Sequence, residues 1–332
     1  MVGEIKKAGL TVYPMRFSRE KFSPIGLFKA ILDVRNAALE MRAGVLHCVS
    51  LRCILLGWLA TMFGLRSLRV VNHVIGMGSI FSEKPKTFRM RLQKSLVSFC
   101  LTRAFQKPFA HTVFQNQDDY YDWIKLAGLS TKQVSRIPGS IEWQDVKQNE
   151  RGGTRILYVG RMLRDKGINE LLQAWQRLRA KVDNCELYMC GSVDPGNPNS
   201  FTEVELRNLS SSKGIFWIGR RNDVLDQMVK SDIVVLPTYR EGFPKVLLEA
   251  GMTCRAVVTT DVPGCRDIVE HEESGLLVEP GNSHELYEAI KRVCLDRELR
   301  QTLAMNLHDK VQSKFTDEAI NPIWEKLYRQ IN

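Results

Sequence analysis

Apolar and polar positions follow two periods along the chain, one typical of strands and one typical of helices. In the second half, short apolar runs predict strands at 156–159, 187–190, 215–217, 233–236, 256–259 and 276–278. Helical segments separate most of them, and in one of these segments Leu171, Trp175 and Leu178 share a face. This β-α-β order is typical of a parallel sheet covered by helices on both faces.

The first half repeats this order less regularly. It predicts strands at 10–14, 45–49, 68–71 and 112–114, and helices at 24–41, 51–63, 88–101 and 119–126. The polar, glycine-ended segment 142–153 predicts a linker. We therefore expect an α/β protein with two domains side by side and a cleft between them. Ligands of such sheets bind beyond the carboxyl ends of the strands, so we expect the functional residues there.

Composition supports two globular domains and places the excess positive charge in one of them. The 332 residues are 44% hydrophobic and 25% charged, which excludes a disordered or fibrous chain. Residues 1–150 contain 22 Lys and Arg against 11 Asp and Glu, whereas 151–332 contain 25 against 26. The net charge of +10 therefore comes from the first half, which indicates a surface for nucleic acid, anionic lipid or an acidic substrate.

The spacing of the cysteines and the length of the most apolar segment test two further classes, zinc-binding proteins and membrane-spanning proteins. None of the eight cysteines forms a C-x-x-C pair, so we expect no zinc site and reduced thiols in a cytoplasm. The uncharged stretch 53–65 has 13 residues, whereas a membrane span needs about 20. We interpret this stretch as a buried helix.

The clearest candidate for chemistry is the sequence EGFPKVLLEA, which begins at Glu241 after a predicted strand. Pro244 suits the first position of a helix, because its missing N–H is not needed there. Backbone N–H groups near Gly242 and Phe243 would then face phosphate or sugar oxygens. Glu241 and Glu249 could accept hydrogen bonds from hydroxyls of two sugar units. An ordinary capped helix with one exposed Glu is the alternative interpretation.

A second candidate is the sequence GRMLRDKG, which begins at Gly160 between a predicted strand and a predicted helix. Gly160 permits a sharp turn. Arg161 offers a bidentate fork and Lys166 a mobile point charge, and together they suit a diphosphate that gains charge as it leaves. A solvated basic turn is the alternative interpretation.

Two further turns follow strands in the second half. The loop that begins with Gly219 and Arg220 could hold a planar base through backbone contacts, and a helix N-cap is the alternative. The sequence DVPGCRD begins at Asp261, and its Pro-Gly pair predicts a turn. Cys265 in this turn has no neighbouring His in the sequence, so we do not expect a catalytic thiol.

In the first half, the sequence NHVIGMG follows a predicted strand and contains Gly76 and Gly78. These glycines indicate a close approach of the backbone to a ligand or acceptor. His73 in the same sequence is either a general base or a structural histidine.

A run of cations in the first half carries much of the excess charge. It consists of Lys84, Lys86, Arg89, Arg91 and Lys94, and it is interleaved with the apolar residues Phe81, Phe88, Leu92, Leu96 and Phe99. This pattern suits a helix that lies on an anionic membrane surface. It suits equally a core helix with a solvated basic face.

Taken in order, the sequences GRMLRDKG, EGFPKVLLEA and DVPGCRD resemble the GT4 family of retaining glycosyltransferases. The resemblance covers nearly all of 151–332 and is closest to the branch that builds bacterial surface polysaccharides on a polyprenyl-diphosphate carrier. The first half resembles the acceptor domain of that family at His47, 114–116 and 137–140. The resemblance implies the GT-B fold, in which two Rossmann-like domains face each other across a cleft that holds the donor.

The resemblance also implies domain boundaries and residue roles. The domains would be 1–145, 146–315 and a helix at 316–332 that crosses back to the first domain. Arg161, Lys166 and Glu241 would be catalytic. The donor site would consist of Gly160, Arg161, Lys166, Arg220, Glu241, Gly242, Phe243 and Glu249, with the cations on the diphosphate, Glu249 on the ribose and Glu241 on the sugar. His73, Gly76 and Gly78 are the acceptor-side candidates.

The expected function is the transfer of a hexose or N-acetylhexosamine, with UDP as the expected nucleotide, to a lipid-linked glycan in capsule, lipopolysaccharide O-antigen or exopolysaccharide synthesis. The expected location is cytoplasmic, on the inner face of the cytoplasmic membrane, with the basic first domain on the anionic surface. We expect no nucleic-acid partner, because no recognition motif is present. We also expect no cofactor and no metal, since the sequence has no Asp-x-Asp and the family that it resembles is metal-independent.

The sequence departs from the family pattern at its start. The first strand, the glycine-rich loop and the next helix of the family are missing before Met1, so the N-terminal domain is expected to be incomplete. Ile75 stands where many relatives have His before Gly. Two alternatives therefore stand beside the transferase: an inactive, N-truncated relative, and a GT-B sugar-nucleotide 2-epimerase.

Overall fold

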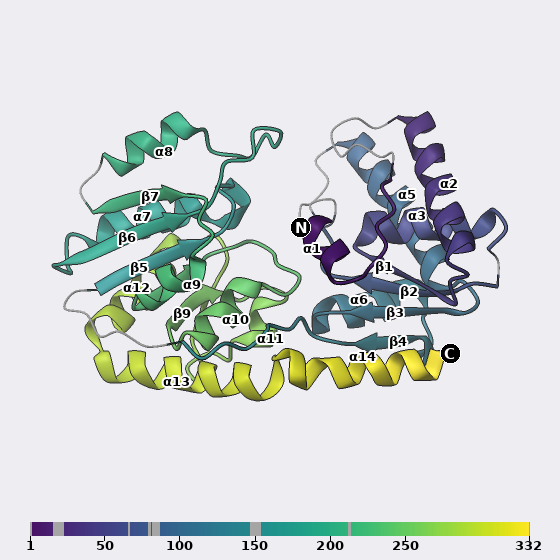
Figure 1. Cartoon of the computed structure of the whole chain (residues 1–332). Coiled ribbons are helices and arrows are strands. Elements are labelled where there is room, and N and C mark those ends of the chain that lie inside the picture. Colours follow the sequence, from purple (N-terminus) through teal and green to yellow (C-terminus); the bar gives the residue numbers. More distant parts are fainter. Residues whose placement is uncertain are drawn as a thin grey trace. The chain divides into compact units, whose positions relative to one another are not determined.

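The computed structural model describes residues 2–15, 23–65, 67–78, 81, 87–146, 154–211 and 214–331. Lys84, Lys86 and the end of the linker expected at 142–153 lie outside these residues. The chain divides into two compact units (Figure 1). Unit 1 comprises Met1–Phe114, Tyr120–Arg136 and Leu327–Asn332, and unit 2 comprises Gln115–Asp119 and Ile137–Lys326.

Unit 1 is built on a parallel sheet of four strands in the order β1-β2-β3-β4. The strands are β1 (Val45–Val49), β2 (Arg69–Val74), β3 (Ala110–Phe114) and β4 (Val134–Arg136). The helices are α1 (Val2–Lys7), α2 (Pro24–Glu40), α3 (Leu51–Met62), α5 (Phe88–Phe105) and α6 (Gln117–Ala127), with a 3₁₀ turn at Thr131–Gln133. The strand expected at 10–14 is wrong, because this segment has no regular structure, and β4 was not expected.

Helix α3 is the apolar stretch interpreted above as a buried helix. Ile54, Leu56 and Ala60 are buried, and Gly57 lets α3 approach β1 so closely that a Cβ there would lie 2.3 Å from Cys48 Sγ. Among the described residues, no helix is both long and apolar enough to span a membrane. The interpretation of this stretch as part of the core is confirmed.

Unit 2 is built on a parallel sheet of six strands in the order β10-β9-β8-β5-β6-β7. The strands are β5 (Thr154–Val159), β6 (Cys185–Cys190), β7 (Ile215–Gly219), β8 (Ile233–Leu236), β9 (Ala256–Thr260) and β10 (Leu276–Val278). The order runs outward from β5 in both directions, so the sheet is doubly wound and its switch point lies between β5 and β8. The predicted α/β class is confirmed, and β5 and β8 are the strands that precede the two clearest candidate sequences.

The helices of unit 2 cover this sheet and fix the loops at its carboxyl edge. They are α7 (Ile168–Leu178), α8 (Glu203–Ser210), α9 (Val224–Val229), α10 (Lys245–Met252), α11 (Cys265–Ile268), α12 (Ser283–Leu295) and α13 (Arg297–Lys314), with a 3₁₀ turn, η2 (Arg164–Lys166). Helix α14 (Asp317–Ile331) contributes to both units. Helix α10 packs against α13 at Gly251, where a Cβ would lie 2.5 Å from Val311. This close packing holds α10 firmly in the unit.

Candidate active site

Glycines mark the ends of β5 and β6 at the carboxyl edge of the unit 2 sheet. The N–H of Gly160 donates to the carbonyl of Cys190 at 3.0 Å, and the N–H of Gly191 donates to the carbonyl of Gly219 at 2.8 Å. A Cβ at Gly191 would lie 1.7 Å from the carbonyl oxygen of Gly160, so only glycine fits there. Arg220 is exposed just beyond β7 on the same edge. Gly191 therefore lets the ends of β5 and β6 pack directly against each other at this edge of the sheet.

The turn after β5 is held against the loop after β8. Gly167 has φ +71°, and a Cβ there would lie 1.9 Å from the carbonyl oxygen of Pro237. The N–H of Tyr239 donates to the carbonyl of Asp165 at 3.1 Å. This contact brings two candidates together: the ammonium of Lys166 lies 2.6 Å from Oε1 of Glu241. The sequence placed both residues at strand ends, and the structure joins them in one ion pair.

The two cations of the turn after β5 differ in their surroundings. Lys166 and Glu241 expose only 16% and 20% of their side chains, so their ion pair is largely shielded from water. Arg161 pairs with Asp194 at 3.0 Å, and both side chains are far more exposed. Water screens exposed pairs strongly. Lys166 is therefore the more strongly held cation and Arg161 the more mobile one.

Helix α10 places Glu249 in its second turn, with Lys245 one turn before it. Pro244 immediately precedes the helix rather than occupying its first position, a shift of one residue from the expectation. Glu249 exposes 18% of its side chain and lies 3.8 Å from Lys245 Nζ. Burial raises the pKa of the Glu249 carboxyl, and the charge of Lys245 opposes that rise. A half-desolvated carboxylate of this kind is suited to accepting hydrogen bonds from ligand hydroxyls.

Gly242 and Phe243 are fixed by contacts from three other segments of unit 2. The carbonyl of Gly242 accepts a hydrogen bond from Asn116 Nδ2 at 2.9 Å. The ring of Phe243 packs edge-on against Phe315, with centroids 5.4 Å apart. Gly264 has φ +79°, and a Cβ there would lie 2.4 Å from the carbonyl oxygen of Gly242. The loop that carries Glu241 is therefore rigidly defined on both sides.

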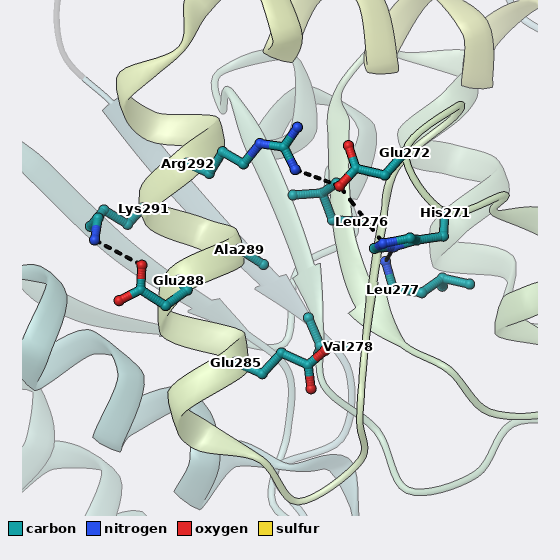
Figure 2. A pocket seen from close by; sticks show the side chains of 10 residues that line it. All are labelled: His271, Glu272, Leu276, Leu277, Val278, Glu285, Glu288, Ala289, Lys291 and Arg292. Atoms are coloured by element: carbon teal, nitrogen blue, oxygen red, sulfur yellow. Dashed lines mark hydrogen bonds and ion pairs between the residues drawn. The ribbon is translucent and has the colours of Figure 1, made fainter.

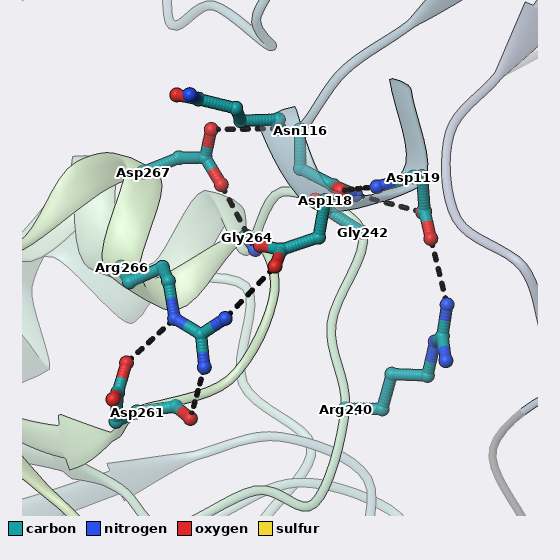
Figure 3. Close-up of polar contacts among 10 residues, drawn as sticks. Asn116, Asp118, Asp119, Arg240, Gly242, Asp261, Gly264, Arg266 and Asp267 are labelled. Atoms are coloured by element: carbon teal, nitrogen blue, oxygen red, sulfur yellow. Dashed lines mark hydrogen bonds and ion pairs between the residues drawn. The ribbon is translucent and has the colours of Figure 1, made fainter. Parts of the chain in front are cut away.

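Figure 3 shows how the short segment Gln115–Asp119 braces these loops. The buried Asp119 accepts a hydrogen bond from Arg240 Nη2 at 2.7 Å. Arg240 is the residue immediately before Glu241. Asp118 accepts from Arg266 at 2.9 Å, and Asp267 accepts from the N–H of Gln117 at 3.0 Å. These contacts tie α11 and the Glu241 loop to one segment.

Two buried side chains near Glu241 remain protonated. Burial and the nearby Glu241 carboxylate raise the pKa of the Cys265 thiol and of the Tyr158 hydroxyl. The Tyr158 hydroxyl donates to the carbonyl of Arg161 at 2.9 Å and so shapes the turn after Gly160. Both groups are therefore held in the protonated form, which is weakly nucleophilic.

The acceptor-side candidates belong to unit 1, whereas the residues described above belong to unit 2. His73 is on β2, and its ring centroid lies 5.4 Å from that of His47 on β1. Nδ1 of His47 lies 2.5 Å from the hydroxyl of Tyr328 in α14. Gly76 and Gly78 follow β2 with φ of +144° and +66°. Both φ values are accessible mainly to glycine, and the two imidazoles are partly withdrawn from water.

We expect His73 to make the stability of the protein fall at acid pH. Burial and the neighbouring His47 lower the pKa of His73 to about 4. Between pH 6.5 and 4 the unfolded chain binds this proton more readily, so about 3 kcal/mol of stability is lost as the pH falls. Urea unfolding over a pH series should show a flatter profile for His73→Gln. The exposed His284→Gln is the control, and an unchanged slope for His73→Gln would contradict this assignment.

A pocket of about 430 Å³ lies between β10 and α12 and contains none of the predicted site residues (Figure 2). Its apolar lining consists of Leu276, Leu277, Val278 and Ala289. The charged side chains around it already pair with one another: Lys291 lies 2.8 Å from Glu288, and Arg292 pairs with Glu272. We assign this pocket no role in the chemistry.

Sequence reasoning missed four residues that the structure places among the candidates: Gly191, Asp194, Asp119 and Arg240. Gly191 follows a strand, which is a usable signal. The other three act through side-chain partners distant in the sequence, as in the Asp119–Arg240 pair. No local pattern marks such pairs, so only the fold reveals them.

A family model described as "Glycosyl transferases group 1" matches residues 140–308. The chain is 28% identical over 286 residues to the capsular polysaccharide biosynthesis glycosyltransferase CapM of Staphylococcus aureus, covering 84% of this chain and 73% of that protein. It is 25% identical over 347 residues to the N,N'-diacetylbacillosaminyl-diphospho-undecaprenol alpha-1,3-N-acetylgalactosaminyltransferase of Campylobacter jejuni, covering 99% and 88%. The crystal structure of Anabaena HepE in complex with UDP and glucose superposes with a TM-score of 0.77 at 18% identity, covering 98% of this chain and 88% of that chain.

Proposed function

Because the chain belongs to the group 1 glycosyl transferases, a family of GT-B fold, we propose that it transfers a hexose or N-acetylhexosamine from a UDP-sugar to a polyprenyl-diphosphate-linked glycan. The product would serve capsule, O-antigen or exopolysaccharide synthesis. CapM is named for capsular polysaccharide biosynthesis, and the Campylobacter relative is named for an undecaprenol diphosphate acceptor. HepE, which shares the fold, was crystallised with UDP and glucose.

The ion pair between Lys166 and Glu241 is the observation that carries this proposal. In a nucleotide sugar, one glycosidic bond joins the diphosphate to the sugar. A cation for the diphosphate and a carboxylate for the sugar hydroxyls must therefore be neighbours, and these two groups are 2.6 Å apart. Without Lys166 the Glu241 carboxylate would repel the donor anion. In this assignment the ion pair separates when the donor binds. Lys166 then binds the diphosphate and Glu241 binds the sugar hydroxyls.

The remaining donor-side residues take roles that follow their places along the sheet edge. Arg161, which is the more exposed cation, joins Lys166 on the diphosphate. The backbone at Gly160, Gly242 and Phe243 approaches the phosphates and the sugar. Glu249 accepts hydrogen bonds from the ribose hydroxyls, and Arg220 lies toward the base.

We propose that the reaction proceeds with retention and requires no metal ion. The acceptor hydroxyl oxygen forms a bond to the anomeric carbon while the bond from that carbon to the phosphate oxygen breaks on the same face. The hydroxyl proton passes to the leaving diphosphate, whose charge Arg161 and Lys166 stabilise. NMR of the product measures the anomeric configuration against that of the donor, and an inverted product would refute this mechanism.

The acceptor is assigned to unit 1, where His73, Gly76 and Gly78 are the candidates. A polyprenyl-diphosphate acceptor is held in a membrane, and the excess cations lie in residues 1–150. We propose that this half binds the anionic inner face of the cytoplasmic membrane peripherally, with no nucleic-acid partner. The cytoplasmic location and the membrane contact are parts of the same proposal.

Thermal shifts with UDP, GDP, ADP and CMP test the donor assignment. A nucleotide at 100 times its dissociation constant stabilises the folded protein by about 2.7 kcal/mol, and we expect this only with UDP. Glu249→Gln should lower the UDP affinity about 10–100-fold, because the two ribose hydroxyls lose charged acceptors. The exposed Glu298→Gln should retain the full shift. Equal shifts for Glu249→Gln and the wild type would refute the role of Glu249.

The same variant separates function from folding through its pH dependence. The raised pKa of Glu249 means that its ionisation opposes folding, so this cost is present at neutral pH and disappears below the ordinary pKa of a glutamate. Ligand-free Glu249→Gln should therefore melt above the wild type at neutral pH and with it at low pH. A variant that melts lower at neutral pH would contradict this.

Transfer of labelled sugar from UDP-sugar into a lipid-linked glycan tests the reaction itself. Release of free UDP with no sugar in the lipid fraction would favour a sugar-nucleotide 2-epimerase. Cooperative melting with no nucleotide shift and no transfer would favour an inactive relative.

A further inference from the structure

Helix α5 of unit 1 has apolar side chains on two opposite faces. One face contains Leu101, Ala104 and Phe105, which are buried and belong to the core. The other face bears apolar side chains spaced four, four and three residues apart, so they form one row along the helix. We call this row the α5 ridge: Phe88, Leu92, Leu96 and Phe99, with 81%, 61%, 60% and 54% of each residue exposed.

A row of this length differs from the scattered apolar residues of an ordinary protein surface. Single exposed apolar side chains are normal, whereas a contiguous row marks a contact with another apolar phase. One apolar face of α5 packs against α3 and β3, as expected for an amphipathic helix. The packing of unit 1 does not require the α5 ridge to be apolar.

The charges on α5 restrict what can cover the ridge. The helix contains Arg89, Arg91, Lys94 and Arg103 and no Asp or Glu. In the part of the chain that the structure describes, no carboxylate forms an ion pair with Arg89 or Arg91. The guanidinium of Arg103 lies 5.1 Å from the centroid of Phe99, so charge and apolar surface adjoin. The partner must therefore be apolar inside and anionic at its rim.

We infer that the α5 ridge inserts among the acyl chains of an anionic membrane, with Arg89, Arg91 and Arg103 at the lipid phosphates. This inference rests on the membrane contact in the proposed function and names the residues that make it. A lipid surface has an apolar interior directly beneath a layer of negative charge, which matches both features of α5. A second copy of the chain fits less well, because two such ridges would bring three arginines each together, with no Asp or Glu on either helix.

Cosedimentation with vesicles tests the inference. The vesicles are phosphatidylglycerol mixed with phosphatidylethanolamine, with phosphatidylcholine vesicles as the uncharged comparison. Arg89→Gln/Arg91→Gln should weaken binding at low salt about fivefold per charge removed. At about 1 M salt the Debye length falls to about 3 Å, so the binding that survives comes from insertion. Leu92→Gln/Leu96→Gln should lower this salt-resistant binding at least tenfold.

The matched control is Leu295→Gln, which alters an equally exposed leucine at the end of α12 and should bind vesicles like the wild type. Cooperative melting and the UDP shift verify that each variant is folded. The inference is overturned if Leu92→Gln/Leu96→Gln binds vesicles like the wild type at high salt. It is also overturned if sedimentation without lipid shows a dimer that this variant dissociates, or if DNA retains the wild type at low salt and anionic vesicles do not.

These outcomes are distinguishable from failure of the proposed function. Wild-type protein that shifts with UDP and transfers sugar but binds no vesicle would overturn the ridge and the membrane contact, and leave the transferase in place. Ridge-dependent vesicle binding without a UDP shift would support the ridge and overturn the donor site.

Discussion

Lys166→Ala is expected to lower kcat/KM for the nucleotide sugar about 10²–10³-fold, the effect typical of removing one charge-stabilising group from a reaction centre. Two losses combine in this variant. The departing diphosphate loses a cation that is 84% shielded from water, and Glu241 loses the partner 2.6 Å away that makes its carboxylate compatible with an anionic ligand. The first loss acts mainly on kcat and the second on KM. Initial rates of UDP release over a range of donor concentrations separate them.

Two neighbouring substitutions distinguish this role from a general effect of charge. Arg164→Ala removes a cation from the same 3₁₀ turn, but Arg164 pairs with Glu205 at 2.8 Å in an exposed position, so its rate should change little. Lys166→Arg keeps the charge and should recover part of the lost rate. Full activity of Lys166→Ala would exclude Lys166 from the reaction.

The parallel sheet of unit 2 was predictable because its strands are buried on both faces. A buried strand must be apolar along its length, so β8 and β10 have the bounds that the apolar runs indicate. The segment 10–14 is equally apolar in part, yet it forms no strand. An apolar run becomes a strand only where a neighbouring strand supplies hydrogen bonds, and that neighbour is not a local property.

The candidate site was predictable for similar reasons, up to a limit. Glycines and charged residues directly after apolar runs indicate the carboxyl edge of a parallel sheet, and this is how Gly160, Lys166 and Glu241 were found. Which of them meet depends on the strand order, because β5 and β8 are neighbours in the sheet although β6 and β7 lie between them in the sequence. The ion pair of Lys166 and Glu241 follows from that order and from no local pattern. The hydrogen bond from Arg240 to Asp119 could not be predicted either, because the two residues are distant in the sequence.

Gly264→Ala is expected to have the second large effect, although the residue bears no functional group. A Cβ at this position would lie 2.4 Å from the carbonyl oxygen of Gly242 and 3.2 Å from the N–H nitrogen of Phe243. The obstacle is backbone, so the Glu241 loop must shift to admit a methyl group. A displacement of this kind at a reacting centre costs about 10²-fold in kcat. The positive φ of Gly264, +79°, adds about 1–3 kcal/mol of strain when a residue with a Cβ occupies it.

A second glycine separates strain from displacement. Gly128, which follows α6, has φ +57° with no atom within 4 Å of a Cβ, so Gly128→Ala introduces strain at a positive φ without a clash. Both variants should melt below the wild type, but only Gly264→Ala should lose turnover and its UDP-sugar affinity. If both retained full kcat/KM at a temperature where both are folded, the position of the Gly242 carbonyl would not matter for catalysis. If both lost it equally, strain at a positive φ and not the position of the Gly242 carbonyl would explain the result. If only Gly264→Ala loses turnover, the packing of Gly264 against the Gly242 carbonyl is what positions the Glu241 carboxylate. Gly264 lies two loops away from Glu241 in the sequence.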